Sequence, residues 1–355
     1  MSGMPNITVR FVEKAATAIS RGSRGVVGLI LKGTVPATNP AIVVTENDIP
    51  AGWTSANKMY AADALKGYVN KPKKVVCYFI STSAEDYSDG LTYFSKNYVD
   101  YLAIPTVATD EAGSAVKTWL QNEWSDHNYI MAVLPDVTAD FEGIVNVTSD
   151  DAKVGSTTYT TEQLTPRIAG LLAGTPFEMS ATYAPLPEFD DVERLTKEQQ
   201  DAAVNAGKFI IFHDGEKIKV GRAVTSLTTT TSTKGESFKK IKLVDTMRTI
   251  SSDIRRTIED AYIGKIPNIY DNKMNLCNAI KAYFKDLSRQ EIVEDDYTID
   301  IDTAANALYL ESKGVDTSEM TEDEIKKANT GDKVYLMAHL HLVDVMEDLD
   351  LPIYI

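Results

Sequence analysis

Apolar runs of strand length alternate with helical segments between residues 25 and 180, and this alternation constrains the fold most strongly. The run KVVCYFI at residues 74–80 is almost continuously apolar, and VDYLAIP (99–105) and NYIMAVLP (128–135) are similar. Strands without polar alternation are buried on both faces, as parallel strands covered by helices are. The sequence therefore predicts an α/β domain, with a mostly parallel sheet and flanking helices. Helices are expected at residues 58–68, 86–97, 110–126 and 161–174.

After residue 180 the pattern changes, and it favours an α+β domain. Thr196 has the residue type and position of a helix N-cap, and Asp214–Gly215 is a typical hairpin turn between two apolar segments. The segment IKLV at residues 241–244 is expected as a strand that precedes a helix N-cap at Asp245. The remaining expected elements are a helix at 196–207, helices at 245–264 and 272–287, and a strand at 297–304.

The last segment, residues 334–355, has the period-two pattern of half-buried strands. Even-numbered positions are apolar up to Leu342, and odd-numbered positions are mostly apolar from Val343 onward. This change of phase predicts a bulge or bend where one strand becomes two. Near the other terminus Ile7, Val9 and Phe11 alternate with polar residues, so a short strand is expected there as well.

These patterns predict two domains with an extended arm at each terminus. A chain of 355 residues is long enough for two domains by length alone. The expected divisions are an N-terminal arm at 1–24, an α/β domain at 25–225 with a short insertion near 33–57, a C-terminal domain at 226–333 and a C-terminal strand arm at 334–355.

Charge and composition limit the partners. The net charge of −15 argues against nucleic acid as a partner. The charge is uneven, because residues 291–355 hold four basic and seventeen acidic side chains while residues 236–290 hold eleven basic and seven acidic ones. The apolar run Val26–Leu31 is far shorter than a membrane span, so no direct membrane insertion is expected. Cys77 and Cys277 are expected to be buried free thiols in a protein made in a reducing compartment.

Signatures of catalysis are absent from the sequence. It contains no GxGxxG, no GxxxxGK[ST] and no GxSxG motif. His339 and His341 lie at spacing two on one strand, but a third metal ligand of suitable type is missing nearby. A Ser–His–Asp arrangement stays open at this point because such triads are assembled in space. We expect no catalytic, cofactor-binding or metal-binding residues, and the alternative is an α/β enzyme or ligand-binding protein with an unrecognised site at the carboxyl ends of the strands.

Over nearly its whole length the chain resembles the contractile tail sheath proteins of myophages and R-type bacteriocins. The resemblance is carried by the order of the Thr-rich loop, IKLVDTMRTISSDIRRTIEDAYIGKIPN, the helix NLCNAIKAYFKDL, a strand and an extended C-terminal arm. The start, MPNITVRFVEKA, is similar to diffocin-like sheaths of Gram-positive bacteria. The resemblance implies that the α/β region is a subtilisin-like sheath domain without the catalytic residues of the protease.

The same resemblance implies a structural protein whose arms join subunits. Arms of this family leave their own subunit and add strands to the sheet of a neighbour, through main-chain hydrogen bonds and side chains that fill pockets. In this chain the N-terminal arm would use Ile7, Val9 and Phe11. The C-terminal arm would use Leu349, Leu351, Ile353 and Ile355. An ordinary edge strand within one chain is the alternative.

The resemblance also implies partners and a location. The chain would form stacked hexameric rings around an inner tail tube protein, meet baseplate and tail terminator proteins, and contract to drive the tube through a target cell envelope. Assembly is expected in the bacterial cytoplasm, and function in the released phage tail or bacteriocin particle. Contact with the tube is expected from basic side chains of the two long C-terminal helices. These are Arg248, Arg255, Arg256, Lys273, Lys281 and Lys285.

Overall fold

The computed structural model describes residues 18–20 and 24–355. The predicted strand at Ile7, Val9 and Phe11 lies outside the described residues. The chain divides into two compact units. We call residues 24–252 together with 344–355 the large unit, and residues 253–343 together with 18–20 the small unit. Each unit is described by itself.

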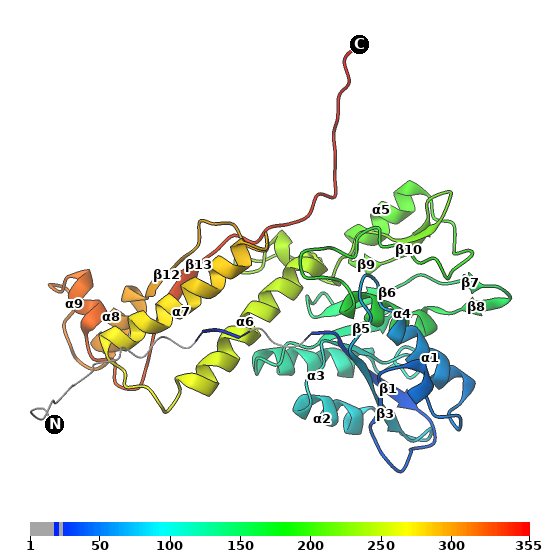
Figure 1. The fold of residues 1–355 in the computed structure, drawn as a ribbon, viewed down its shortest axis with the longest axis horizontal. Coiled ribbons are helices and arrows are strands. Elements are labelled where there is room, and N and C mark those ends of the chain that lie inside the picture. The colour runs from blue at the N-terminus through cyan, green and yellow to red at the C-terminus, as the bar shows by residue number, and fades with distance from the viewer. Residues whose placement is uncertain (1–17, 21–23) are drawn as a thin grey trace, which may run out of the picture. The chain divides into compact units, whose positions relative to one another are not determined.

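A seven-stranded sheet forms the centre of the large unit, in the order β2-β3-β1-β4-β5-β6-β9 (Figure 1). All neighbouring strands run parallel except β2 and β3, which pair antiparallel. The mostly parallel sheet predicted from the apolar runs is therefore confirmed. The strands are β1 (Val26–Lys32), β2 (Ala41–Val43), β3 (Lys74–Ile80), β4 (Tyr101–Ala103), β5 (Met131–Pro135), β6 (Ile144–Val147) and β9 (Lys208–Phe209).

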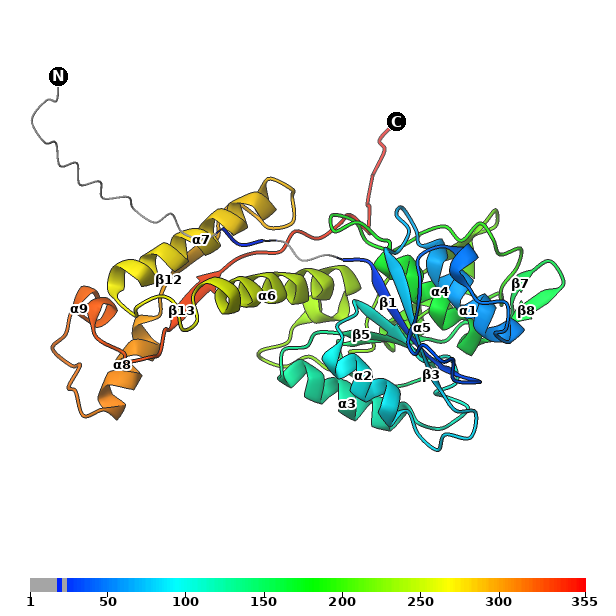
Figure 2. The same ribbon diagram turned by 60° about the horizontal axis from the view of Figure 1, so that its bottom comes forward.

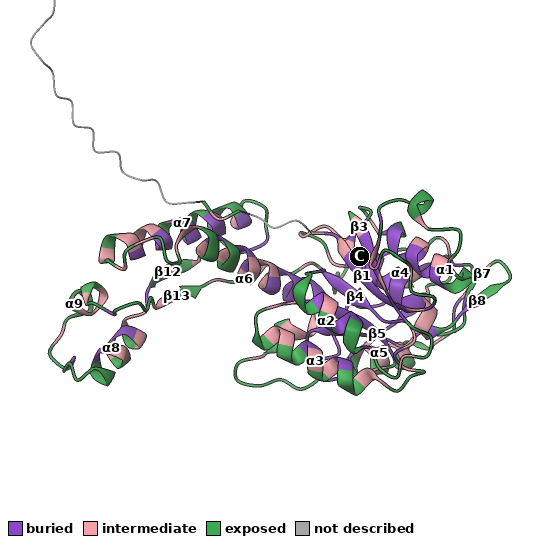
Figure 3. Cartoon of the chain, turned by 90° about the horizontal axis from the view of Figure 1, so that it is seen from below, coloured by how far each residue is buried: buried purple, intermediate pink, exposed green. Residues whose placement is uncertain are grey.

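Helices cover both faces of this sheet, because alternate strand residues point into two separate apolar cores. Leu29 of β1 belongs to the core beneath α1 (Ser55–Lys66) and α4 (Thr161–Ala173). Ile30 belongs to the opposite core, beneath α2 (Ser88–Lys96) and α3 (Gly113–Ser125). Figure 3 shows this burial as purple strands inside helices that are green on their outer faces.

Shorter elements complete the large unit. The predicted hairpin is present as β10 and β11, with Asp214 accepting hydrogen bonds from the amides of the turn. Thr196 caps α5 through the amide of Gln199, as its residue type predicted. These elements are β7 (Ala152–Val154), β8 (Thr157–Tyr159), α5 (Lys197–Asn205), β10 (Ile211–His213), β11 (Ile218–Val220) and the 3-10 helices η1 (Glu46–Asp48) and η2 (Glu236–Lys239).

The small unit combines helices with a two-stranded antiparallel sheet of β12 and β13 (Figure 2). The helix α6 (Ile241–Ala261) begins in the large unit and passes into the small unit after Ser252. Among the described residues, no helix is long and apolar enough to cross a membrane. The other elements are α7 (Tyr270–Ser288), β12 (Thr298–Ile301), α8 (Thr303–Ser312), α9 (Glu322–Lys327) and β13 (Leu336–His339).

The strand predicted at residues 241–244 is wrong. These residues form the first turn of α6, and the amide of Val244 donates to the carbonyl of Lys240 at 3.0 Å. Ile241 and Val244 both enter the core beneath α1 and α4. Four residues, three of them apolar, are too few to show a period, so helix and strand cannot be distinguished there without the packing partner.

Candidate subunit-contact surfaces

The end of the chain has two parts with different surroundings. Up to Val343 it pairs with its own small unit, since β13 pairs with β12 and the amide of Val343 donates to the carbonyl of Ile292. From Leu349 onward the side chains are exposed, at 86% for Leu349, 68% for Leu351 and 79% for Ile353. In Figure 1 the red chain end extends away from the large unit without returning to it. The apolar residues of the arm are therefore presented to solvent.

Between these parts, residues 344–348 bind the large unit through three acidic side chains. Glu347 is the central one: its Oε1 accepts a hydrogen bond from Thr182 Oγ1 at 2.6 Å, and its Oε2 lies 3.1 Å from Lys240 Nζ. Asp348 Oδ1 accepts from Arg222 at 2.6 Å, and Asp344 pairs with Lys240. We call this cluster the arm anchor. It consists of Thr182, Arg222, Lys240, Asp344, Glu347 and Asp348.

The local fold brings the basic groups of the arm anchor together. Val224 and Lys240 form an isolated antiparallel bridge, which aligns the segment holding Arg222 with the segment before α6. Thr182 joins them because its Oγ1 accepts a hydrogen bond from the amide of Ala223 at 3.0 Å. The hydroxyl therefore uses its donor for Glu347 and an acceptor for the backbone, which determines its orientation.

Electrostatics favour the charged forms of three residues of the arm anchor, Arg222, Lys240 and Asp348. The hydrogen bond between Arg222 and Asp348 raises the pKa of the guanidinium and lowers the pKa of the carboxyl. Burial alone would lower the pKa of Lys240, but its hydrogen bonds to Asp344 and Glu347 outweigh burial and raise it. Because its pKa is lowered on folding, ionised Asp348 stabilises the folded protein. This stabilisation is fully present above pH 3.8, the ordinary pKa of the group, and is lost as the pH falls through the lower pKa of the folded state. The stabilisation from protonated Lys240 is fully present below pH 10.5, the ordinary pKa of the group, and is lost as the pH rises through the raised pKa of the folded state.

The small unit has an open apolar groove of about 770 Å³. Its floor contains Ile280 and Phe284 of α7, which are 3% and 1% exposed. Ile299 of β12 and Ala338 of β13 are paired across the sheet and both line the groove. A two-stranded sheet is marginal by itself in water, and within the described part of the chain its outer edges pair with no further strand. The groove and the sheet edges together are suited to receive an extended apolar segment.

The six basic residues expected to contact a tube separate into two groups. Arg255, Arg256, Lys281 and Lys285 are exposed, and Arg255 pairs with Glu259 at 2.8 Å. Arg248 and Lys273 are only 3% and 4% exposed, so they cannot contact a tube from the surface of this chain. Lys273 donates to Thr330 Oγ1 at 3.1 Å, and burial lowers its pKa. The prediction for these two residues rested on their basic side chains and helical positions. Helical periodicity does not show that other segments of the chain pack over them.

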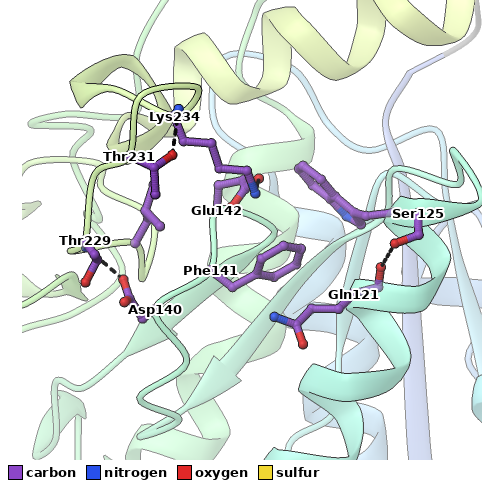
Figure 4. A pocket seen from close by; sticks show the side chains of 10 residues that line it. Gln121, Ser125, Asp140, Phe141, Glu142, Thr229, Thr231 and Lys234 are labelled. Carbon is purple, nitrogen blue, oxygen red and sulfur yellow. Dashed lines mark hydrogen bonds and ion pairs between the residues drawn. The ribbon is translucent and has the colours of Figure 1, made fainter.

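The large unit has a polar pocket of about 510 Å³ that is lined by serine and acidic residues (Figure 4). It can therefore be compared with the Ser–His–Asp arrangement that the sequence left open. Asp140 accepts hydrogen bonds from the amides of Thr228 and Thr229, and Glu142 pairs with Lys234. Ser125 Oγ donates to the carbonyl of Gln121 within its own helix. The residues that line this pocket include no histidine, so the pocket contains no Ser–His–Asp arrangement.

Three histidines, His127, His213 and His341, make polar contacts within the chain. His213 Nδ1 accepts from the amide of Gly215 at 2.9 Å, and His127 Nδ1 lies 2.9 Å from the hydroxyl of Tyr129. His341 does have acidic neighbours that the sequence analysis missed, since its Nδ1 lies 2.7 Å from Asp296 and Glu294 is also close. All three side chains are exposed, and this cluster alone does not constitute a metal site.

Sequence reasoning missed the arm anchor entirely. Its three acidic residues lie in the anionic segment 291–355 that the charge distribution identified. No sequence pattern distinguished Thr182, Arg222 and Lys240 from other surface residues. The change of phase at Leu342–Val343 was the closest indication, since the chain passes from the small unit to the large unit directly after Val343.

Comparison with known proteins assigns the family. Residues 81–226 match the phage tail sheath protein central domain, and residues 233–355 match the phage tail sheath C-terminal domain. The chain is 37% identical, over 99% of both chains, to the tail sheath protein of Clostridium phage phiCD119.

Two solved assemblies contain chains of similar fold. The anti-feeding prophage baseplate, which was 6-fold symmetrised, has one with a TM-score of 0.68 and 16% identity, covering 100% of this chain and 99% of that one. The contracted sheath complex of the extracellular contractile injection system PVC has another, with a TM-score of 0.68 and 15% identity, covering 100% and 98%. The chain belongs to the phage tail sheath family, whose members are structural proteins and not enzymes.

Proposed function

We propose that this chain polymerises through its C-terminal arm, with residues 349–355 acting as a donor strand for a second copy. The supporting observation is the contrast along the end of the chain. Residues up to 343 pair with their own small unit, whereas Leu349, Leu351 and Ile353 are 68–86% exposed although their apolar face would favour burial. Apolar side chains at alternate positions of an extended segment are what strand addition uses.

The acceptor in this proposal is the small unit of the neighbouring copy. The donor strand pairs with an outer edge of the β12–β13 sheet, and its apolar face enters the groove beside Ile280 and Phe284. Main-chain hydrogen bonds supply the link, and the added strand covers a sheet edge that is otherwise open. The N-terminal strand at Ile7, Val9 and Phe11 is proposed to act in the same way on another copy.

The finer features of the assembly follow the family resemblance. We propose stacked hexameric rings around an inner tube, with baseplate and terminator proteins at the two ends and assembly in the bacterial cytoplasm. The subtilisin-like character of the sheet and the origin in a diffocin-like R-type bacteriocin or a phage tail belong to the same proposal. Arg255, Arg256, Lys281 and Lys285 remain the proposed tube contacts, and exposed ion pairs of about 0–1 kcal/mol each permit release.

Contraction in this proposal needs no nucleotide. Subunits rotate and move outward while the strand links stay paired, and the contracted arrangement buries more surface between subunits. At about 25 cal/mol per Å² of apolar surface, modest additional burial in each subunit gives a large sum over a long polymer.

Deletion of residues 349–355 tests the donor strand. These residues are exposed, so the shortened protein should keep its circular dichroism spectrum and its thermal stability. Electron microscopy of the full chain should show tubes, and the shortened chain should show none at the same concentration.

A matched pair of double variants separates side-chain packing from chain length. Leu351→Asp with Ile353→Asp changes the apolar face, and Asp350→Asn with Tyr354→Ser changes the opposite face of the same strand. The first pair should abolish tubes and the second should retain them. Tubes of normal length from the first pair, or a full chain that stays monomeric at high concentration, would contradict the proposed donor strand.

A further inference from the structure

We propose that the arm anchor positions the C-terminal arm for assembly. It determines where residues 349–355 leave the large unit and limits the mobile part of the arm to those residues. Thr182, Arg222 and Lys240 are in this proposal positioning residues, since they act by holding residues 344–348 of their own chain. The inference rests on the proposed function, in which residues 349–355 are the donor strand.

Glu347 is a buried carboxylate between two exposed residues, Met346 and Asp348. Its side chain is 6% exposed, whereas that of Asp348, the next residue, is 80% exposed. Lys240 lies 3.1 Å from Glu347 Oε2 and Arg222 lies 3.6 Å from it, so two cations compensate one buried charge. A buried carboxylate without compensating cations is energetically costly, and separating Glu347 from Lys240 and Arg222 would leave such a group. The ion pairs therefore hold the arm at Glu347.

The anchor has cations on one side and acids on the other. Asp344 and Asp348 add an acid on each side of Glu347, and each pairs with one of the two cations that also face Glu347. The three acids belong to five consecutive residues, so the whole of residues 344–348 is held. A single ion pair at the surface would leave the arm free to pivot, whereas contacts at both ends of this segment also determine its direction.

Loss of the anchor would change the reach of the arm. The free segment would grow from residues 349–355 to residues 344–355, which adds five residues or roughly 16 Å of extended chain. A longer flexible segment has a lower effective concentration at any single acceptor, and it can reach acceptors that the shorter segment cannot. The anchor therefore favours one neighbour over others and reduces the ordering required when the strand docks.

Cleavage after Glu347 by a glutamate-specific endopeptidase measures whether the anchor holds. The protein is kept below the concentration at which tubes form, and release of residues 348–355 is followed by mass spectrometry. Lys240→Gln and Arg222→Gln leave the arm sequence unchanged, so a change in rate reports exposure of Glu347 and not its intrinsic reactivity. We expect cleavage to accelerate at least about tenfold in each variant, because each removes one of the two cations that compensate the buried charge of Glu347.

The controls are neighbours of the same residue type. Lys239 precedes Lys240 but pairs with Glu236, and Arg194 pairs with Asp191, so neither faces the arm. Lys239→Gln and Arg194→Gln should cleave at the rate of the unaltered chain. Tryptophan fluorescence verifies that the large unit is folded in every variant, since Trp53, Trp119 and Trp124 all lie in it.

Assembly measures whether the anchor positions the arm. Variants with accelerated cleavage should need several-fold more protein to form tubes, and Lys240→Arg, which keeps a cation opposite Asp344 and Glu347, should lose less than Lys240→Gln. Unchanged cleavage would overturn the anchor itself. Accelerated cleavage with normal tube formation would overturn the positioning role. If the unaltered chain forms no tubes, the proposed function fails, and the cleavage rates still decide whether the anchor holds the arm.

Discussion

Arg248 is a charged residue enclosed by other charged and aromatic groups near the start of α6. Its Nε donates to Asp245 at 2.6 Å, and one terminal nitrogen donates to the hydroxyl of Tyr98 at 3.0 Å. Burial alone would raise the pKa of Asp245, but the charges of Arg248 and Arg24 outweigh burial and lower it. The first half of α6 is therefore joined to the sheet by ionic contacts as well as by apolar packing.

Replacement of Arg248 by Met should lower the free energy of unfolding of the large unit by about 3–5 kcal/mol, since it leaves a buried acid with one partner fewer. Urea unfolding followed by tryptophan fluorescence measures this loss. Arg194→Met is the control, because Arg194 is 58% exposed and its pair with Asp191 should contribute less than about 1 kcal/mol. Equal losses in the two variants would show that Arg248 is not a buried structural residue.

At the scale of elements, α1 and α4 approach so closely that one position between them has no room for a side chain. A Cβ added to Gly170 of α4 would lie 2.1 Å from the carbonyl oxygen of Ala64 in α1. Backbone atoms cannot move aside as the end of a flexible side chain can. The glycine therefore sets the distance between the two helices over this face of the sheet.

Gly170→Ala should destabilise the large unit by about 1–3 kcal/mol, because overpacking exceeds the gain in helix propensity of about 1 kcal/mol. Thermal unfolding by circular dichroism measures the difference. Gly52→Ala is the matched control, since an added Cβ at Gly52 has no atom within 4 Å, and it should be within about 0.5 kcal/mol of the unaltered chain. A stabilised Gly170→Ala variant would mean that the helices can separate without cost.

At the scale of the whole molecule, the two cysteines happen to mark the two units. Cys77 lies on β3 in the large unit and Cys277 on α7 in the small unit, and both are buried free thiols, as the sequence predicted. Burial raises the pKa of the Cys77 thiol, and it raises the pKa of Cys277 to about 11. Both thiols should therefore react slowly with alkylating reagents in the folded protein at pH 8.

Pulsed alkylation in increasing urea should label Cys277 before Cys77. The small unit has a smaller core and a sheet of two strands, so it buries less apolar surface and should unfold at a lower urea concentration. Mass spectrometry of the two cysteine peptides gives both transitions in one experiment. A single midpoint shared by both cysteines would mean that the units unfold together.

The sequence by itself determined the elements that rest on local periodicity. The strand predicted at residues 74–80 has those bounds in the structure as β3, and the helix predicted at 161–174 is present as α4, Thr161–Ala173. Hydrophobic period is a property of neighbouring residues, so it can be read before the chain is folded. The alternation of apolar and polar residues in the C-terminal arm can be read from the sequence in the same way.

Only the tertiary structure decided which charged residues are buried and which segments meet. Arg248 and Lys273 were predicted to contact a tube from the surface of two helices, but both are buried and bonded to segments distant in sequence. The arm anchor joins Glu347 to Thr182 across 165 positions and Asp348 to Arg222 across 126. Contacts over such separations leave no periodic trace in the sequence, because they depend on how the sheet and helices pack and not on the residues beside them.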